Sequence, residues 1–169
     1  MTAVRQPRNE LLDVPEIVRQ LREGPEQIRA LTTRLSAAEL QRRPAPDEWS
    51  INENLAHLRA AADVWGSYMR RIVAEERPTF TSINPRARMR KTDYPELEFA
   101  PSFYAYLTQR VDLITLLDAL PSAAWARTAT VKVYAERFEF SVQYYGDKLA
   151  RHEAVHVPQI EGLVRSLRQ

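Results

Sequence analysis

The chain contains only three histidines, and their spacing suggests metal chemistry. His152 and His156 are four residues apart, so on an α-helix they project from the same side, one turn apart. Two imidazoles in this arrangement can bind one ion. Apolar residues share that side, and His57 lies beside an apolar stripe of an earlier segment, so all three are expected to face the interior. Three neutral imidazoles around a divalent ion leave a coordination position open, as catalytic sites do.

The spacing alone leaves a second interpretation open, in which the histidines are separate core residues that each bond to a carbonyl or a tyrosine. Residues 152–156 also match the His-Glu-x-x-His string of zinc peptidases, in which the glutamate activates a metal-bound water. Only a short segment follows His156, and the sheet that such peptidases build upstream is not evident, so a peptidase is not expected. We expect Glu153 to make a surface salt bridge or to contact a metal ligand.

Helical phase selects further candidates for the site. Gln159 follows the histidine pair by about one turn and is placed to orient a bound water or a substrate amide. Tyr145 precedes the pair by two turns on the same face, and with Glu153 and Gln159 it completes the candidate catalytic residues. Asn54 and Glu53 lie one turn before the first histidine and are placed to accept a hydrogen bond from its non-ligating ring N–H. Glu53 also fits a helix-capping role.

Helical periodicity predicts the elements that must position these residues. Four glycines in 169 residues argue against an all-β protein and exclude a glycine-rich phosphate loop. Apolar residues recur at steps of three and four over residues 14–35, 51–75, 102–120 and 141–168, which predicts four helices. We expect a bend or break at Pro25 and a kink at Pro158. Ser50, with Glu53 three residues later, predicts a capping box at the start of the second helix.

The connections predict how the helices are arranged. About 25 residues without convincing periodicity join the second and third helices, which is long for a compact domain. Such a connection can cross the length of a bundle, so we infer that these two helices run parallel. Residues 128–140 alternate weakly and are compatible with a small hairpin before the last helix. The sequence thus predicts an all-α four-helix bundle that forms a single domain over residues 1–169.

Composition excludes other classes of function. The chain has no cysteine, which rules out disulfides, thiolate metal sites and a thiol nucleophile of its own. Its 24 basic and 22 acidic residues leave a formal charge of +2, and no basic stripe of the kind that binds nucleic acid is evident. No stretch approaches the length of a membrane span, and the first ten residues are polar. We therefore expect a cytoplasmic protein with a small-molecule substrate and without nucleic-acid or membrane partners.

Two segments carry a family resemblance. Residues 44–50 read Pro-Ala-Pro-Asp-Glu-Trp-Ser and lead into a helix that carries His57, and a late helix carries His152, His156 and Gln159. This pattern resembles the DinB-like superfamily, which includes bacterial thiol transferases and the mycothiol-dependent maleylpyruvate isomerase. The resemblance implies helices in up-down-down-up order and one divalent ion, zinc or nickel, on His57, His152 and His156. Family members are often homodimers, so a dimer is a further expectation.

The resemblance also implies an activity, namely a metal-dependent transferase that uses a low-molecular-weight thiol of the bacillithiol or mycothiol type. Two alternatives stay open: a metal-dependent hydrolase that uses the bound water, and a metal-stabilised binding module without turnover. A structural metal site would be closed by a fourth protein ligand. Because the chain has no fourth histidine and no cysteine, that ligand would be a carboxylate such as Glu53 or Asp63.

Overall fold

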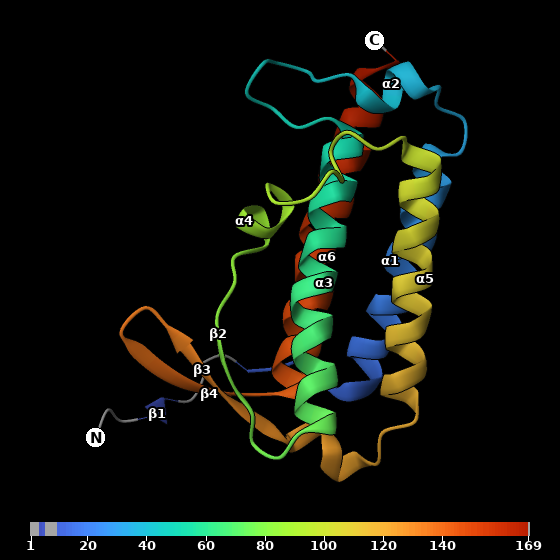
Figure 1. Cartoon of the computed structure of the whole chain (residues 1–169). Helices are drawn as coiled ribbons and strands as arrows, with labels where there is room; N and C mark the ends of the chain where they lie inside the picture. Colours follow the sequence, from blue (N-terminus) through green and yellow to red (C-terminus); the bar gives the residue numbers. More distant parts are fainter. Residues whose placement is uncertain (1–3, 6–9, 169) are drawn as a thin grey trace.

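Four long helices form the body of the molecule, a computed structural model that describes residues 4–5 and 10–168 (Figure 1). They are α1 (Val14–Thr32), α3 (Ile51–Ala74), α5 (Phe99–Asp118) and α6 (Val142–Ser166). These match the four predicted helices to within a few residues at each end. α1 and α6 run upward in Figure 1 and α3 and α5 run downward, which confirms the parallel second and third helices. Helices α1, α6, α3 and α5 follow one another around the bundle.

The helix ends follow local rules. Ser50 caps α3 by accepting a hydrogen bond from the Glu53 N–H at 3.1 Å, and the Glu53 carboxylate accepts one in return from the Ser50 N–H at 2.9 Å. The predicted capping box is therefore present. α1 is one helix through Pro25, so the alternative of a break there is wrong, and α6 is one helix that includes Pro158.

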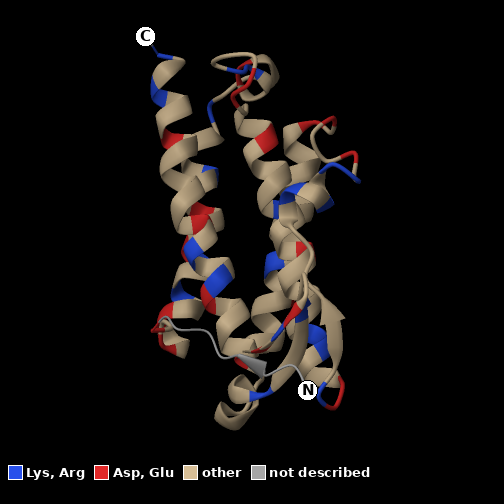
Figure 2. Cartoon of the chain, turned by 90° about the vertical axis from the view of Figure 1, so that its left-hand side faces the viewer, with Lys and Arg blue, Asp and Glu red and all other residues tan. Residues whose placement is uncertain are grey.

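The prediction of an all-α protein holds for the bundle but not for the whole molecule, because a small sheet packs at one end of it (Figure 1 and Figure 2). The predicted hairpin is present as β3 (Thr128–Val133) and β4 (Glu136–Ser141), which pair antiparallel. β2 (Thr79–Thr81) joins β3 and β1 (Val4–Arg5) joins β4, both in parallel, to give the order β1-β4-β3-β2. These two strands are too short for alternation to be visible in the sequence. A 3₁₀-helix, η1 (Ser122–Ala126), links α5 to β3.

The connection between α3 and α5 lies along α3 and carries structure of its own. It contains β2 and a short helix, α4 (Pro85–Met89). The Asn52 side-chain amide donates to the carbonyls of Pro95 and Leu97, both at 3.0 Å, and the Tyr94 hydroxyl donates to Asp63 at 2.8 Å. These bonds fasten the crossover to α3, so that α4 stands over one side of the bundle. A second short helix, α2 (Ala37–Gln41), follows α1.

A polar layer divides the apolar core across the middle of the bundle. One cluster of buried apolar residues fills the end near the sheet, and another fills the end near α2. On α6 the first cluster ends at Ala150 and the second begins at Ile160, and the histidine pair lies between them. Buried polar groups need partners in such a position. The mid-bundle layer is therefore where chemistry or a specific polar network is expected.

Candidate metal centre

The structure brings the three histidines together in this layer. Their candidate ligand nitrogens all lie within 4.8 Å of one another, and the Nε2 atoms of His57 and His152 are 2.9 Å apart. His57 comes from α3, and the other two come from α6, which packs against it. The rings of the α6 pair are 4.5 Å apart between centroids, as residues one turn apart should be. The spacing along α6 therefore places two of the histidines together, and the packing of α3 against α6 adds the third.

Burial keeps the three imidazoles in the neutral form that binds metals. It lowers the pKa of His152 to about 3 and that of His57 to about 4, and the neighbouring histidine and arginine charges act in the same direction. Burial also lowers the pKa of His156, while a hydrogen bond with Gln159 opposes it. Two protonated rings at this distance would repel each other, which further favours the neutral form. At neutral pH each ring therefore keeps a lone pair available.

Asn54 determines which nitrogen of His156 is free. Its amide N–H₂ donates to the Ser50 carbonyl at 2.9 Å, which only the nitrogen end of the amide can do. The oxygen end therefore faces His156 Nδ1 at 3.2 Å and accepts its N–H. This leaves the Nε2 lone pair of His156 directed elsewhere, in the tautomer that metal sites use. The amide was expected to contact His57, but the packing of α6 on α3 gives it to His156 instead.

Two buried imidazole nitrogens have no hydrogen-bond partner among the described residues. They are the Nδ1 atoms of His57 and His152, while the Nε2 atoms of the same rings face each other. Without an ion, one Nε2 donates its N–H to the Nε2 lone pair of the other ring, so the two rings share one proton at this contact. An ion beside both Nε2 atoms would use both lone pairs and place the protons on Nδ1. The donor set therefore fits a divalent metal ion that favours imidazole.

Glu153 is not part of this cluster. It lies on the side of α6 that faces α1 and α5, where its carboxylate accepts a hydrogen bond from the Tyr106 hydroxyl at 2.6 Å and one from Arg110 Nη1 at 2.7 Å. Both members of the ion pair have side chains that are 2% exposed. The expected surface salt bridge is therefore wrong, because the pair is buried. Its partner Arg110, which also donates to the Leu21 carbonyl at 3.0 Å, could not be identified from the sequence.

The other candidates are divided between the site and the core. Gln159 lines a pocket next to the cluster and is exposed. Glu53 is occupied by the capping box and by an ion pair with Arg43, so it does not serve His57. Tyr145 is buried among aromatic rings, 5.1 Å from that of Tyr68, and no contact among the described residues joins it to a histidine. Of the three candidate catalytic residues, only Gln159 is among those that line this pocket.

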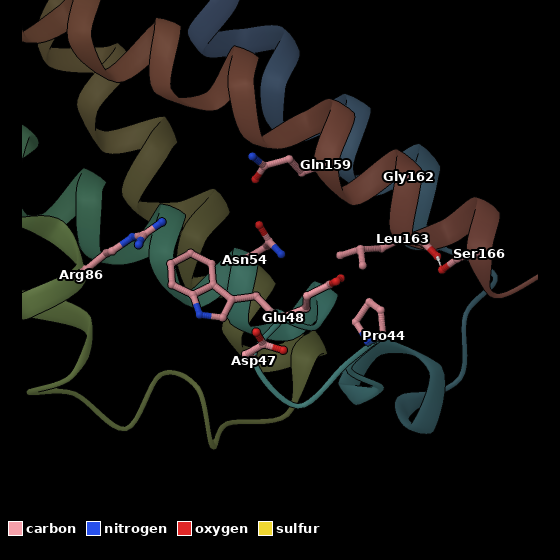
Figure 3. A pocket seen from close by; sticks show the side chains of 10 residues that line it. Pro44, Asp47, Glu48, Asn54, Arg86, Gln159, Gly162, Leu163 and Ser166 are labelled. Carbon is pink, nitrogen blue, oxygen red and sulfur yellow. Dashed lines mark hydrogen bonds between the residues drawn. The ribbon is translucent and has the colours of Figure 1, made fainter.

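A pocket of about 540 Å³ opens beside the cluster, and Figure 3 shows the residues that line it, none of which is a histidine. Asn54 from α3 and Gln159 from α6 extend into it, and Asn54 also accepts the Nδ1 N–H of His156. Arg86 reaches the pocket from α4, and Asp47 and Glu48 line it from the loop before α3. Asn54 and Trp49 line the pocket and contact His156 and His57, so a small molecule there would be one side chain away from the cluster.

No fourth protein ligand closes the cluster among the described residues. The histidines are the only group of three or more potential ligand residues found in that part of the chain. Asp63 accepts hydrogen bonds from Tyr94 and Gln109, and Glu53 is held by Arg43. Both carboxylates that were expected as a possible fourth ligand are therefore bound to other side chains. An ion on three imidazoles would keep an open position, as catalytic zinc does.

Comparison with known proteins gives a family and a fold. Residues 20–160 match the DinB superfamily. The structure resembles YfiT from Bacillus subtilis, described as a probable metal-dependent hydrolase with an unusual four-helix bundle topology, with 14% identity and a TM-score of 0.78 over 98% of this chain and 94% of that one. It also resembles the mycothiol-dependent maleylpyruvate isomerase, with 14% identity and a TM-score of 0.68 over 88% of this chain and 61% of the isomerase. No curated protein shows significant sequence similarity. Within the described residues no helix is both long and apolar enough to cross a membrane.

Proposed function

The chain belongs to the DinB superfamily, and we propose that it is a metal-dependent enzyme whose divalent ion, zinc or nickel, is held by His57, His152 and His156. One observation carries this proposal: three neutral imidazoles with ligand atoms within 4.8 Å lie beside a pocket and have no closing carboxylate. Such an ion, when bound, polarises carbonyl groups and lowers the pKa of a bound water or thiol to near neutrality.

The chain's own residues supply the setting for this chemistry. Asn54 keeps the proton of His156 on Nδ1, because its carbonyl oxygen can only accept. Trp49 and Trp65 pack their rings at 5.0 and 5.1 Å from those of His57 and His152 and thereby shield the imidazoles from water. Gln159 offers both an N–H donor and a carbonyl acceptor to a molecule in the pocket.

The leading activity is transfer of a low-molecular-weight thiol of the bacillithiol or mycothiol type. The chain has no cysteine, so a thiol nucleophile would arrive with the substrate. The similarity to an isomerase that depends on mycothiol supports a thiol substrate for the four-helix bundle of this chain. This chain spans 61% of that isomerase, so we propose only the use of a thiol and not the isomerisation of maleylpyruvate.

Hydrolysis is the second candidate. YfiT, described as a probable metal-dependent hydrolase, is matched over 94% of its length, which makes it the more complete likeness. A metal-bound water would take the open position in this case. A binding module without turnover is disfavoured because no fourth ligand closes the cluster within residues 4–5 and 10–168 and because a pocket adjoins it.

Metal content and activity can be measured on the same preparations. Tag-free protein purified without chelators should contain about one zinc or nickel per chain, and His152→Ala should contain none. Lys132→Ala, on the exposed side of β3, is the control and should retain the metal. Loaded protein should then conjugate a thiol to an electrophile such as monochlorobimane faster than it hydrolyses nitrophenyl acetate. No metal in the wild type, even after loading, would refute the site, and faster hydrolysis would favour the second candidate.

A further inference from the structure

A positive charge stands beside the histidine cluster on the side of α4. The guanidinium Cζ of Arg86 lies 4.8 Å from the Trp49 ring centroid, and that ring is 5.0 Å from the His57 ring. Tryptophan is the aromatic side chain that attracts a cation most strongly. Arg86 is exposed, lines the pocket, and lowers the pKa of all three histidines. Trp49 thus separates a histidine from a cation that can reach a bound molecule.

The same arrangement recurs on the other tryptophan. Lys148 Nζ lies 5.2 Å from the Trp65 ring centroid, and that ring meets the His152 ring edge-on at 5.1 Å. Lys148 is one turn before His152 on α6 and half-buried, and it too lowers the pKa of His152. The cluster is therefore flanked by cations on two sides.

Carboxylates oppose only part of this charge: Asp147 raises the pKa of Lys148, and Glu153 raises that of His156. Glu153 is neutralised by Arg110 on the opposite side of α6. No carboxylate forms an ion pair with Arg86 in the part of the chain that the structure describes. Asp47 and Glu48 line the pocket from the loop before α3, and neither is among the groups that shift a histidine pKa. A divalent ion on three neutral imidazoles would add two more positive charges to this environment.

We propose that the pocket binds an anionic small molecule, whose metal-binding group meets the histidine centre while a separate anionic group, a carboxylate or its equivalent, pairs with Arg86. This inference rests on the proposed function and narrows its substrate class. Arginine suits the role because its planar donors bind carboxylate and phosphate oxygens in pairs. Asp47 and Glu48 repel the second anionic group from the loop side of the pocket and direct it toward α4. A neutral thiol of equal length would lack this contact.

Two thiols of the same length test the inference on cobalt-loaded protein. Mercaptopropanesulfonate and mercaptopropanol differ in their far end, and a sulfonate is a poor metal ligand, so it reports on the protein. Binding is followed by the cobalt–thiolate charge-transfer absorbance at constant ionic strength. The wild type should bind the sulfonate about tenfold more tightly, the worth of one charged contact.

Arg86 in α4 and Arg90, the residue that caps its C-terminus, provide a matched pair of variants. Arg86→Met should reduce the preference for the sulfonate to near unity without weakening the neutral thiol. Arg90→Met removes the same charge from the C-terminal end of α4, outside the residues that line the pocket, and should keep the preference. Equal affinities in the wild type, a preference that survives Arg86→Met, or an equal loss in both variants would overturn the inference. Failure to bind cobalt would overturn the metal site as well, whereas cobalt binding with no sulfonate preference would overturn the anionic class alone.

Discussion

Gly24→Ala tests whether Glu153 is locked in the polar layer. A Cβ at Gly24 would lie 2.6 Å from Glu153 Oε2, well inside van der Waals contact. A carboxylate at the end of a free side chain would swing away at little cost. This one is held by Arg110 Nη1 at 2.7 Å and by the Tyr106 hydroxyl at 2.6 Å, and all three side chains are buried. The clash therefore has to be absorbed by the ion pair or by separation of α1 from α6.

The magnitude follows from opposing contributions. Replacing a helical glycine by alanine gains about 0.5–1 kcal/mol, and overpacking a filled interior costs about 1–3 kcal/mol. If the new methyl group broke the ion pair, the cost would approach the roughly 3–5 kcal/mol of an uncompensated buried charge. We expect Gly24→Ala to lower the free energy of unfolding by about 1–3 kcal/mol.

Gly66→Ala in α3 is the control, because a Cβ there has no neighbour within 4 Å. It should raise the free energy of unfolding by about 0.5–1 kcal/mol. Urea unfolding in the presence of a chelator compares the variants without a contribution from bound metal. If Gly24→Ala stabilises the protein as Gly66→Ala does, Glu153 is free to move and its assignment to a locked ion pair is wrong.

Glu153→Gln should lower the free energy of unfolding by about 3–5 kcal/mol, because it leaves Arg110 buried without a counter-charge. The folded variant should still contain metal in elemental analysis. Loss of metal with unchanged stability would show that Glu153 belongs to the metal site. His152→Ala should show the reverse, with metal lost and the fold kept. Asn54→Ala should weaken zinc affinity about 10- to 100-fold in a competition titration, and an unchanged affinity would remove its role in orienting His156. In urea, the free energy of unfolding of the metal-free protein should fall below about pH 6.5, by up to about 1.4 kcal/mol per pH unit for each buried histidine. The reason is that the histidines of the unfolded chain bind protons in this range. The folded rings do not, because their pKa values are about 3 for His152 and about 4 for His57. A flat profile between pH 7 and about pH 5 would contradict this expectation.

The differences between prediction and structure concern side chains with more than one available partner. Glu153 was expected to make a surface salt bridge or to contact a metal ligand, because it stands between two histidines in the sequence. Its neighbours on α5 and α1 are 43 or more residues away, and nothing local marks Arg110 as the cation that meets it. Asn54 was assigned to His57, on its own helix, whereas the contact comes from α6. Short strands such as β2 and β1 form only because a hairpin edge is already there to pair with.

The sequence by itself determined the four long helices, the capping box at Ser50 and the common face of His152 and His156, because each depends on residues within a few turns of one another. Three features were decided by the tertiary structure alone. The Nε2 atoms of His57 and His152 lie 2.9 Å apart, Asn54 bonds to His156, and Arg86 reaches the pocket. Those outcomes depend on the rotation and height at which helices pack. Both are determined by contacts between residues distant in the chain, which helical periodicity does not encode.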